Sequence, residues 1–378
     1  MAEHLRIRKR LQSVLDAGEV ASVAQWVLSE RDQLSRKLRI SLVDSCNLGC
    51  FFCHNDGQGA LGRSRGVISA DEFRSLIRAA ARAGVCEVKL TGGEPLLYRV
   101  GLSNTVDLVR RLADLRCELP FGLSMTTNGL LLDGMVGDLA QAGLDRVTVS
   151  LHTLDPSTFG QAVSSRSPES KLRSVRAGVR SAVLAGLNPV KINMVLFAGD
   201  ETTNGNLDEI AHMVGFARSQ GVAELRLYTL QQSHSMSRTR FDSNYQFWTR
   251  QFVSSLASRL SPDRATDIES AINDFVDRWR ATLYPKPRLL LDLDGLAVSI
   301  ETMEDGRFEA LGLPAEGPYA MRMSADGWLR GSLSDVPTVN PLHMLRSGCS
   351  ERHLVAAFEN ARQQLLPREL AAFAPSGL

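Results

Sequence analysis

Between residues 37 and 232 the chain alternates short apolar runs with amphipathic segments, and no other feature constrains its fold as strongly. Six apolar runs predict strands, and each is followed by a helical pattern or a loop. These runs are LRISLVD, CEVKLTGG, GLSMTTNG, RVTVSLH, PVKINMVLF and ELRLYTL. Because parallel strands need crossover connections, which helices supply, the repeated βα units predict an α/β fold built on a parallel sheet or barrel.

Two further segments flank this region. Residues 1–36 carry apolar residues at helical spacing among polar ones, which predicts an N-terminal helical leader. Residues 233–378 are less regular, with a helical stretch over roughly 245–283, a β-like tail and a final helix. We expect this C-terminal part to be an α+β extension that closes the barrel and contributes to the substrate site.

The charge of the chain is balanced, with 43 Lys+Arg against 42 Asp+Glu and a formal net charge of +1. A nucleic-acid scaffold or a polybasic membrane binder needs an excess of clustered cations, so neither class fits. The first residues show no signal peptide, and no apolar stretch is long enough to span a membrane. We therefore expect a cytoplasmic protein that binds neither nucleic acid nor membranes.

Cys46, Cys50 and Cys53 form the pattern C-x3-C-x2-C directly after the first predicted strand. Thiolates bind soft metals, and this spacing lets one loop bring three sulfurs to one ion or cluster. A structural zinc site has four ligands, whereas an iron-sulfur cube held by three cysteines keeps one iron open. A zinc loop with His54 as its fourth ligand is the alternative. The isolated Cys86 and Cys117 lie in or beside apolar patterns and are expected to be buried.

Polar residues also follow the other predicted strands. They are Gly92, Gly93, Glu94, Thr126, Asn128, Ser150, His152, Asn193 and Tyr228. Because the carboxyl ends of parallel strands meet at one edge, we expect these groups to share one mouth with the cysteines. The glycines allow close backbone approach, and the Glu94 carboxylate can accept hydrogen bonds from an ammonium group. His152 and Tyr228 are the candidates for proton transfer.

The cysteine pattern with Phe52 before its last cysteine, together with Gly-Gly-Glu-Pro after the second strand, resembles the radical S-adenosylmethionine (SAM) superfamily. This resemblance implies a partial (β/α)6 TIM-like barrel and a 4Fe-4S cluster whose open iron is chelated by SAM. It implies that an electron donor such as flavodoxin or ferredoxin triggers SAM cleavage, and that the resulting 5′-deoxyadenosyl radical abstracts hydrogen from the substrate. Residues implied to hold SAM are Phe52, Gly92, Gly93, Glu94, Thr126, Asn128, Ser150 and Asn193.

Longer segments, from LRISLVDSCNLGCFFC to RMSADGWLRGSL, resemble the family of GTP cyclases of molybdopterin biosynthesis, called MoaA. Basic residues that match substrate- or SAM-facing positions of that family are Arg39, Lys89, Lys191, Arg226 and Arg322. Glu87 and Ala320 stand where the family usually has a cation. The cysteines that hold its second cluster are replaced by Ala315, Pro318 and Ser332, so we expect a single cluster here.

A carboxylate beside a triphosphate adds repulsion where attraction is needed. These departures therefore predict a substrate with less negative charge than GTP: a nucleotide, nucleoside or sugar-nucleoside that bears a monophosphate or carboxylate. Such chemistry, carbon-carbon bond formation or decarboxylation, is typical of similar relatives in nucleoside natural-product pathways. Two alternatives stay open: a GTP cyclase that lacks the second cluster, and a non-enzymatic zinc or iron-sulfur sensor.

Overall fold

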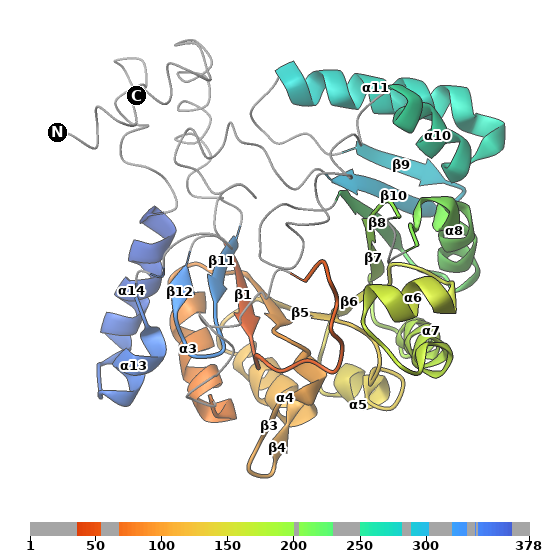
Figure 1. Ribbon diagram of the computed structural model, residues 1–378. Coiled ribbons are helices and arrows are strands. Elements are labelled where there is room, and N and C mark those ends of the chain that lie inside the picture. Colours follow the sequence, from red (N-terminus) through yellow and green to blue (C-terminus); the bar gives the residue numbers. More distant parts are fainter. Residues whose placement is uncertain are drawn as a thin grey trace, which may run out of the picture.

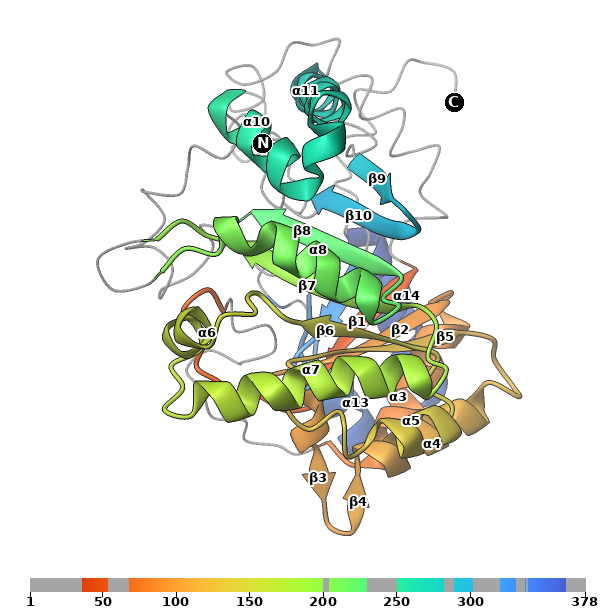
Figure 2. The same cartoon turned by 90° about the vertical axis from the view of Figure 1, so that its right-hand side faces the viewer.

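The computed structural model describes residues 36–53, 68–199, 204–229, 250–281, 289–301, 320–330, 337 and 339–364. Over these residues the chain forms a curved sheet with helices along its outer side (Figure 1 and Figure 2). The predicted leader, apart from Arg36, and the three positions predicted to lack second-cluster cysteines lie outside the described residues.

Six parallel strands form the centre of this sheet, and they coincide with the six predicted apolar runs. They are β1 (Lys37–Ser41), β2 (Glu87–Thr91), β5 (Gly122–Thr127), β6 (Arg146–Ser150), β7 (Val190–Leu196) and β8 (Glu224–Thr229). Each strand pairs with the next one along the chain, as successive βα units do. The predicted partial TIM-like barrel is confirmed.

The crossover helices begin at capping residues that the sequence supplies. Helix α3 (Ala70–Arg82) starts at Ser69, whose Oγ accepts a hydrogen bond from Glu72 N while the Glu72 carboxylate accepts one from Ser69 N. Helix α4 (Thr105–Leu115) starts with the same arrangement between Asn104 and Asp107. Such capping boxes satisfy amide groups that have no partner within the helix. The other helices of the barrel are α5 (Val136–Gln141), α6 (Pro156–Ala162), α7 (Pro168–Leu184) and α8 (Ile210–Ser219).

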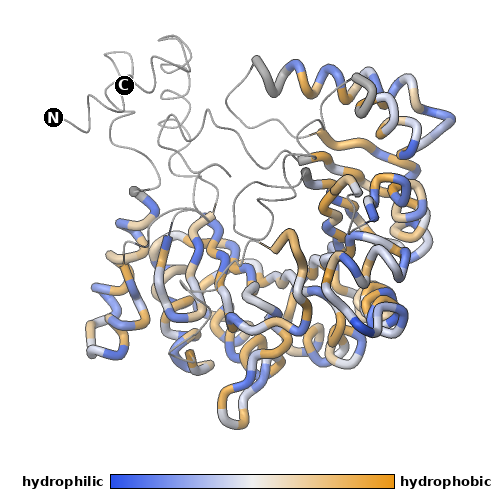
Figure 3. Tube along the Cα trace, in the orientation of Figure 1, coloured by the Kyte–Doolittle hydropathy of each residue, from blue (hydrophilic) through white to orange (hydrophobic). Residues whose placement is uncertain are grey.

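The two faces of the sheet have opposite character, because side chains alternate along each strand. The helix-facing positions are apolar and fully buried, as Leu38 and Ile40 of β1 and Val88 and Leu90 of β2 show. The inner positions between them are polar or charged. Figure 3 shows this mixture of apolar and polar residues along strands and helices. The hydrophobic core therefore lies between sheet and helices, and the inner face is left for chemistry.

The C-terminal region adds strands to both edges of the same sheet. Strand β10 (Leu296–Glu301) pairs parallel with β8 and carries the antiparallel β9 (Leu289–Leu293). Strand β11 (Ala320–Met323) pairs parallel with β1 and carries the antiparallel β12 (Leu329–Arg330).

Helices and a small hairpin complete the described structure. They are α10 (Arg250–Leu260), α11 (Ala265–Ala281), α13 (Pro341–Arg346), α14 (Glu351–Gln364) and the hairpin of β3 (Arg99–Val100) and β4 (Ser103–Asn104). The single helical stretch predicted over 245–283 is two helices, because Pro262 interrupts it. No helix in the described part of the chain combines the length and apolar character that crossing a bilayer requires.

Candidate active site

The cysteine loop, residues 42–53, leaves β1 and runs along the Gly-Gly-Glu segment after β2. The amide of Gly93 donates to the carbonyl of Val43 (2.8 Å), and that of Glu94 donates to Ser45 (2.8 Å). A side chain at position 93 would place its Cβ only 2.0 Å from the Ser45 carbonyl oxygen. Glycine is therefore required here so that the backbone ahead of the first cysteine can pair with the segment after β2.

The far end of the same loop is anchored on α6. Gly49 N donates to Val163 O (3.0 Å), and Phe51 N donates to Ala162 O (3.1 Å). The Phe51 ring packs edge-on against Phe197, with centroids 5.2 Å apart. The loop thus reaches from β1 across the strand ends to α6 (Figure 1), and it carries its cysteines at the mouth.

The three cysteine thiols lie near one another. Cys46 and Cys53 are exposed and Cys50 is half-buried, and none forms a disulfide. Burial raises the pKa of Cys50, and the neighbouring Cys53 and Cys46 raise it further. Burial also raises the pKa of Cys46, although Asn128 Nδ2 donates a 3.6 Å hydrogen bond to its sulfur. Positively charged iron would offset both effects and ionise the thiols.

The donor set fits an iron-sulfur cluster. No three His, Cys, Asp or Glu side chains of the described residues converge closely enough to ligate one metal ion. A 4Fe-4S cluster takes one thiolate per iron, so its cysteines stand further apart than the ligands of a single ion. Three thiols would leave one iron open, as the sequence pattern predicts. His54, the fourth ligand of the zinc alternative, lies outside the described residues.

The Glu94 carboxylate is fully buried and joins two loops of the site. It accepts hydrogen bonds from Thr127 Oγ1 (2.6 Å), Asn128 N (2.8 Å) and Leu96 N (3.1 Å). Burial raises its pKa, and these hydrogen bonds oppose the rise. Glu94 therefore positions the turn after β5, and its Oε2, which accepts only from Asn128 N among the described residues, keeps a lone pair for a further donor. Sequence reasoning chose Thr126 and missed Thr127, because the alternation that buries Thr127 depends on register.

Asn128 connects the turn after β5 with the cysteine loop. Its Nδ2 donates to Asn47 Oδ1 (2.7 Å) as well as to the Cys46 sulfur, and its Oδ1 accepts from Leu130 N (3.0 Å). The predicted site residue therefore lies beside the first cysteine. Asn47 was not singled out from the sequence, where it is one polar residue among several in a loop.

His152 lies under Phe52, with ring centroids 4.5 Å apart. Its Nδ1 accepts a hydrogen bond from Val195 N (2.9 Å), and burial lowers its pKa to about 4. The buried Asn206, which the sequence did not reveal, donates to the carbonyls of His152 and Val195 (2.7 Å each). At neutral pH the ring is therefore neutral, with its proton on Nε2, and Nδ1 is not available as a base.

This environment makes His152 a source of acid sensitivity. Its pKa lies below the ordinary value of 6.5, so the unfolded chain binds the proton more tightly and stability falls as pH drops below 6.5. Lowering pH from 7 to 5 is expected to cost about 2 kcal/mol through this group. Urea unfolding of wild type and His152→Gln at both pH values measures it, and an equal loss in the two proteins would contradict the assignment.

Three of the five matched cations lie side by side on the inner face. Arg39 stands in register with Lys89 on β2 and with Arg322 on β11. The Arg39 Nε atom is buried with no hydrogen-bond partner among the described residues. Burial and the neighbouring Arg39 lower the pKa of Lys89 well below its ordinary value. The neighbouring like charges of Arg39 and Lys89 are unfavourable by themselves and favour an anionic ligand.

The other two matched cations are bound to a buried carboxylate. Glu224 accepts from Lys191 Nζ (2.5 Å), from Arg226 Nε (2.8 Å) and from Ser299 Oγ (2.8 Å). Burial alone would raise the pKa of Glu224, but the hydrogen bonds from Arg226 and Lys191 lower it to about 2. Lys191 and Arg226 therefore share one carboxylate within the protein, which the sequence did not reveal.

Glu87, which departs from the family pattern, also pairs with cations. Its carboxylate lies 3.0 Å from Lys37 Nζ and 2.8 Å from an Arg146 nitrogen. Burial opposes ionisation, but Lys37 and Arg146 lower the pKa of Glu87 overall. Ala320, the other departure, stands in register with Lys37.

The remaining predicted residues lie on or near the same face. Ser150 is in register with Asn193, and Asn193 with Arg226. The Asn193 Oδ1 atom is buried without a hydrogen-bond partner among the described residues, so it has an acceptor to offer a ligand. Tyr228 is half-buried near the mouth end of β8. The structure thus brings the predicted polar residues to one edge of the sheet.

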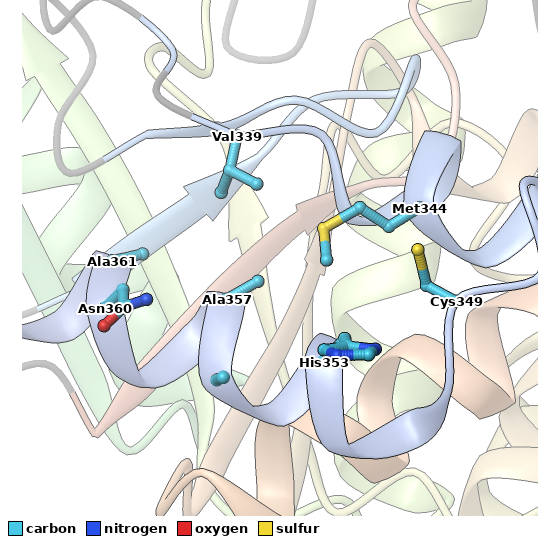
Figure 4. A pocket seen from close by; sticks show the side chains of 8 residues that line it. Val339, Met344, Cys349, His353, Ala357, Asn360 and Ala361 are labelled. Carbon is cyan, nitrogen blue, oxygen red and sulfur yellow. The ribbon is translucent and has the colours of Figure 1, made fainter.

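The other three cysteines lie apart from this loop. Cys86 and Cys117 were expected to be buried, but both are exposed, because they fall at the ends of β2 and α4 rather than within them. Cys349 borders a cavity of about 450 Å³. Figure 4 shows its lining by Val339, Met344, Cys349, His353, Ala357, Asn360 and Ala361. These residues belong to α13, α14 and adjoining segments, not to the ends of the parallel strands.

The fold and the site together define a β/α barrel with three cysteine thiols at its mouth. The sequence pattern described as "Radical SAM superfamily" matches residues 40–213. A probable GTP 3′,8-cyclase of Methanothermobacter thermautotrophicus is 32% identical over 299 residues, which cover 78% of this chain and 83% of that protein. The chain belongs to the radical SAM superfamily and, within it, is MoaA-like.

Other relatives match a shorter part. A probable GTP 3′,8-cyclase of Methanopyrus kandleri is 42% identical over 190 residues, 49% of this chain and 57% of that protein. Over such alignments the chain spans little more than half of the relative. Among solved structures, Streptococcus suis SuiB bound to S-adenosylmethionine aligns with a TM-score of 0.54 and 16% identity, covering 86% of this chain and 68% of SuiB. That likeness supports the fold.

Proposed function

We propose that this radical SAM enzyme uses one 4Fe-4S cluster, on Cys46, Cys50 and Cys53, to remove hydrogen from a nucleotide, nucleoside or sugar-nucleoside with a monophosphate or carboxylate group. When bound, the cluster and SAM supply a carbon radical able to take hydrogen from an unactivated C–H bond. Flavodoxin or ferredoxin is the expected electron donor. The protein's own residues bind the substrate, orient it and bind its phosphate or carboxylate group.

The observation that carries this proposal is the distribution of charge on the inner face. Of the inner-face cations, four are paired with two carboxylates: Lys37 and Arg146 with Glu87, and Lys191 and Arg226 with Glu224. Arg39 and Lys89 lie side by side in register, and neither is paired with a carboxylate among the described residues. A compact anion with one or two charges suits these two adjacent cations better than an extended triphosphate does.

We assign the SAM site to the mouth above these two cations. Gly92, Gly93 and Glu94 would hold the methionyl ammonium, because Glu94 Oε2 accepts only from Asn128 N among the described residues and has a second lone pair. Asn193 Oδ1 offers an acceptor without a described partner. Tyr228 stays the candidate proton donor or acceptor, since His152 Nδ1 is occupied by Val195 N.

The test combines iron counting with SAM cleavage. Anaerobic reconstitution is expected to yield about four irons per chain, and about eight would overturn the single cluster. With reduced flavodoxin, a nucleoside monophosphate or uronic-acid nucleoside should stimulate 5′-deoxyadenosine formation more than GTP does. Zinc without iron would favour the sensor alternative. If none of these nucleotides and nucleosides stimulates SAM cleavage, the proposed substrate class is wrong.

Substituting Lys89 tests the substrate site directly. Lys89→Gln is expected to raise KM for the stimulating substrate about tenfold, because one charged hydrogen bond to the anion is lost. Lys171→Gln on α7 is the control for removing a lysine charge elsewhere and should leave KM unchanged. An unchanged KM in Lys89→Gln would contradict the placement of the anion.

GTP cyclisation is the second candidate, and the names of the relatives favour it. The cysteines of this chain are at 46, 50, 53, 86, 117 and 349, so the sequence has no C-x2-C pair beyond residue 86 for a second cluster. A cyclase would therefore have to bind guanine in another way. Stronger stimulation of SAM cleavage by GTP than by every monophosphate would favour this candidate.

A further inference from the structure

Helix α7 and the linker before it carry a concentration of positive charge. Residues 156–187 contain one acidic residue, Glu169, and five cationic ones: Arg166, Lys171, Arg173, Arg176 and Arg180. The chain as a whole is nearly balanced, with a net charge of +1. Positive charge is therefore distributed unevenly over the protein, and this part of the surface attracts a partner of opposite charge.

Four of the five cations are exposed, and together we call them the α7 ridge: Arg166, Arg173, Arg176 and Arg180. The last three are spaced i, i+3 and i+7 along α7, which places them on one side of the helix. The buried residues of α7 lie on its other side: Leu172, Val175, Gly178, Val179 and Ala182. The ridge thus faces away from the core, and Figure 2 shows α7 along the outside of the barrel.

The α7 ridge differs from the arginines of other outer helices, because these have carboxylate partners. In α3 and α4 the ion pairs are Arg74 and Arg78 with Glu118, Arg82 with Glu351, Arg110 with Asp107, and Arg111 with Asp71. In the described part of the chain, no carboxylate pairs with an arginine of the ridge.

Two arginines of the ridge are held by neutral groups of α8 and the turn after it. The Arg176 guanidinium lies over the Phe216 ring, 5.5 Å from its centroid. Arg180 Nε donates to Gln220 Oε1 (3.2 Å). Neither partner carries a negative charge, so these contacts position the two side chains and leave their positive charge uncompensated.

The mouth end of the ridge adjoins the cysteine loop. The amides of Gly49 and Phe51, on either side of Cys50, donate to carbonyls at the end of α6 (3.0 and 3.1 Å). A Cβ at Gly49 would lie 3.5 Å from the Cβ of Ser164, which is two residues before Arg166. A partner bound to the ridge would therefore lie beside the loop, with a short connection through the end of α6 to the backbone around Cys50.

We propose that the α7 ridge is the docking surface of the electron donor, a small acidic one-electron carrier such as flavodoxin or ferredoxin. This surface presupposes the proposed function, because only a redox enzyme needs such a donor. Each transfer oxidises the carrier by one electron and reduces the cluster on Cys46, Cys50 and Cys53 by one, and no proton or leaving group moves. Interfaces between electron-transfer partners are small and transient, so opposite charges are what steer their association.

Binding of oxidised flavodoxin to the reconstituted enzyme tests the surface without turnover. Arg166→Gln/Arg173→Gln is expected to raise Kd about tenfold at low ionic strength and to weaken the salt dependence, since two attractive charges are lost. Arg110→Gln/Arg111→Gln is the matched control, because it removes the same charge from exposed arginines of α4 that already have carboxylate partners. Its Kd should equal that of the wild type. Equal weakening in both variants would show an effect of net charge alone and overturn the docking surface.

Two reductants separate this surface from the proposed function. With dithionite, Arg166→Gln/Arg173→Gln and the wild type should cleave SAM at equal rates, whereas limiting reduced flavodoxin should drive the variant about tenfold more slowly. If flavodoxin binds both proteins equally while dithionite drives cleavage, the docking surface is wrong and the proposed function stands. Absence of cleavage with dithionite and the substrate panel would refute the proposed function itself. If the ridge binds single-stranded RNA and not flavodoxin, the class of partner is wrong.

Discussion

Gly93→Ala is expected to abolish cluster binding and SAM cleavage. The added methyl group would lie 2.0 Å from the Ser45 carbonyl oxygen and 2.7 Å from that of Asp44. Both obstacles are backbone, so the cysteine loop must move away and lose the hydrogen bonds from Gly93 and Glu94. We expect iron to fall well below one cluster per chain, SAM cleavage to fall more than 100-fold, and unfolding free energy to drop by about 3 kcal/mol.

Gly215→Ala in α8 is the matched control, because a Cβ at Gly215 meets nothing within 4 Å. It should bind iron like the wild type and be slightly more stable, as alanine favours helix. Iron content, the charge-transfer absorption of the cluster and urea unfolding are the measurements. Wild-type iron content and SAM cleavage in Gly93→Ala would show that the loop tolerates the methyl group, contrary to the contact described here.

Glu224→Gln is expected to shift nucleotide selectivity toward higher charge. The carboxylate binds both Lys191 and Arg226, and its loss would leave both cations available to phosphate groups. We expect Kd for GTP to fall about tenfold while Kd for GMP changes little, because the terminal phosphates gain a charged partner. Titration of both nucleotides into wild type and variant measures the ratio, and an unchanged ratio would contradict the role assigned to Glu224.

The same substitution should lower stability by about 2 kcal/mol, because two largely buried cations lose their counter-charge. The folded pKa of Glu224 is about 2, below its ordinary 4.5. Its stabilising contribution is therefore present above pH 4.5 and is lost as pH falls toward 2, and the variant should lack this part of the acid dependence. Glu118→Gln is the control: Glu118 is exposed, lies 3.4 Å from Arg74 and Arg78, and should change stability little.

Local patterns predicted the barrel and the position of its mouth. The six central strands coincide with six apolar runs, because the side of each strand that packs against helices needs apolar residues. The cysteine triplet and the Gly-Gly-Glu segment are also local, and both fall at strand ends as expected. The exposure of Cys86 and Cys117 was misjudged, because a shift of one or two residues at the end of an element decides whether a side chain is covered.

Pairings between distant segments could not be predicted in this way. The hydrogen bonds that Glu94 accepts from Thr127 and Asn128, more than thirty residues away in the chain, were not expected. The Glu224 carboxylate binds Lys191, which was predicted to bind the substrate. Both outcomes depend on which side chains meet across the sheet, and a carboxylate carries no sign of its partner in the sequence.

By itself the sequence determined the class of fold, the thiol site and the resemblance to radical SAM enzymes, because periodicity and short motifs act over a few residues. Only the tertiary structure decided which cations of the inner face pair with carboxylates of the protein. Strand register places Arg39 beside Lys89 and Arg322. Lys191 and Arg226, by contrast, form ion pairs with Glu224. Electrostatic energy depends on separations of a few ångströms between residues far apart in the chain, and these separations exist only once the sheet has formed.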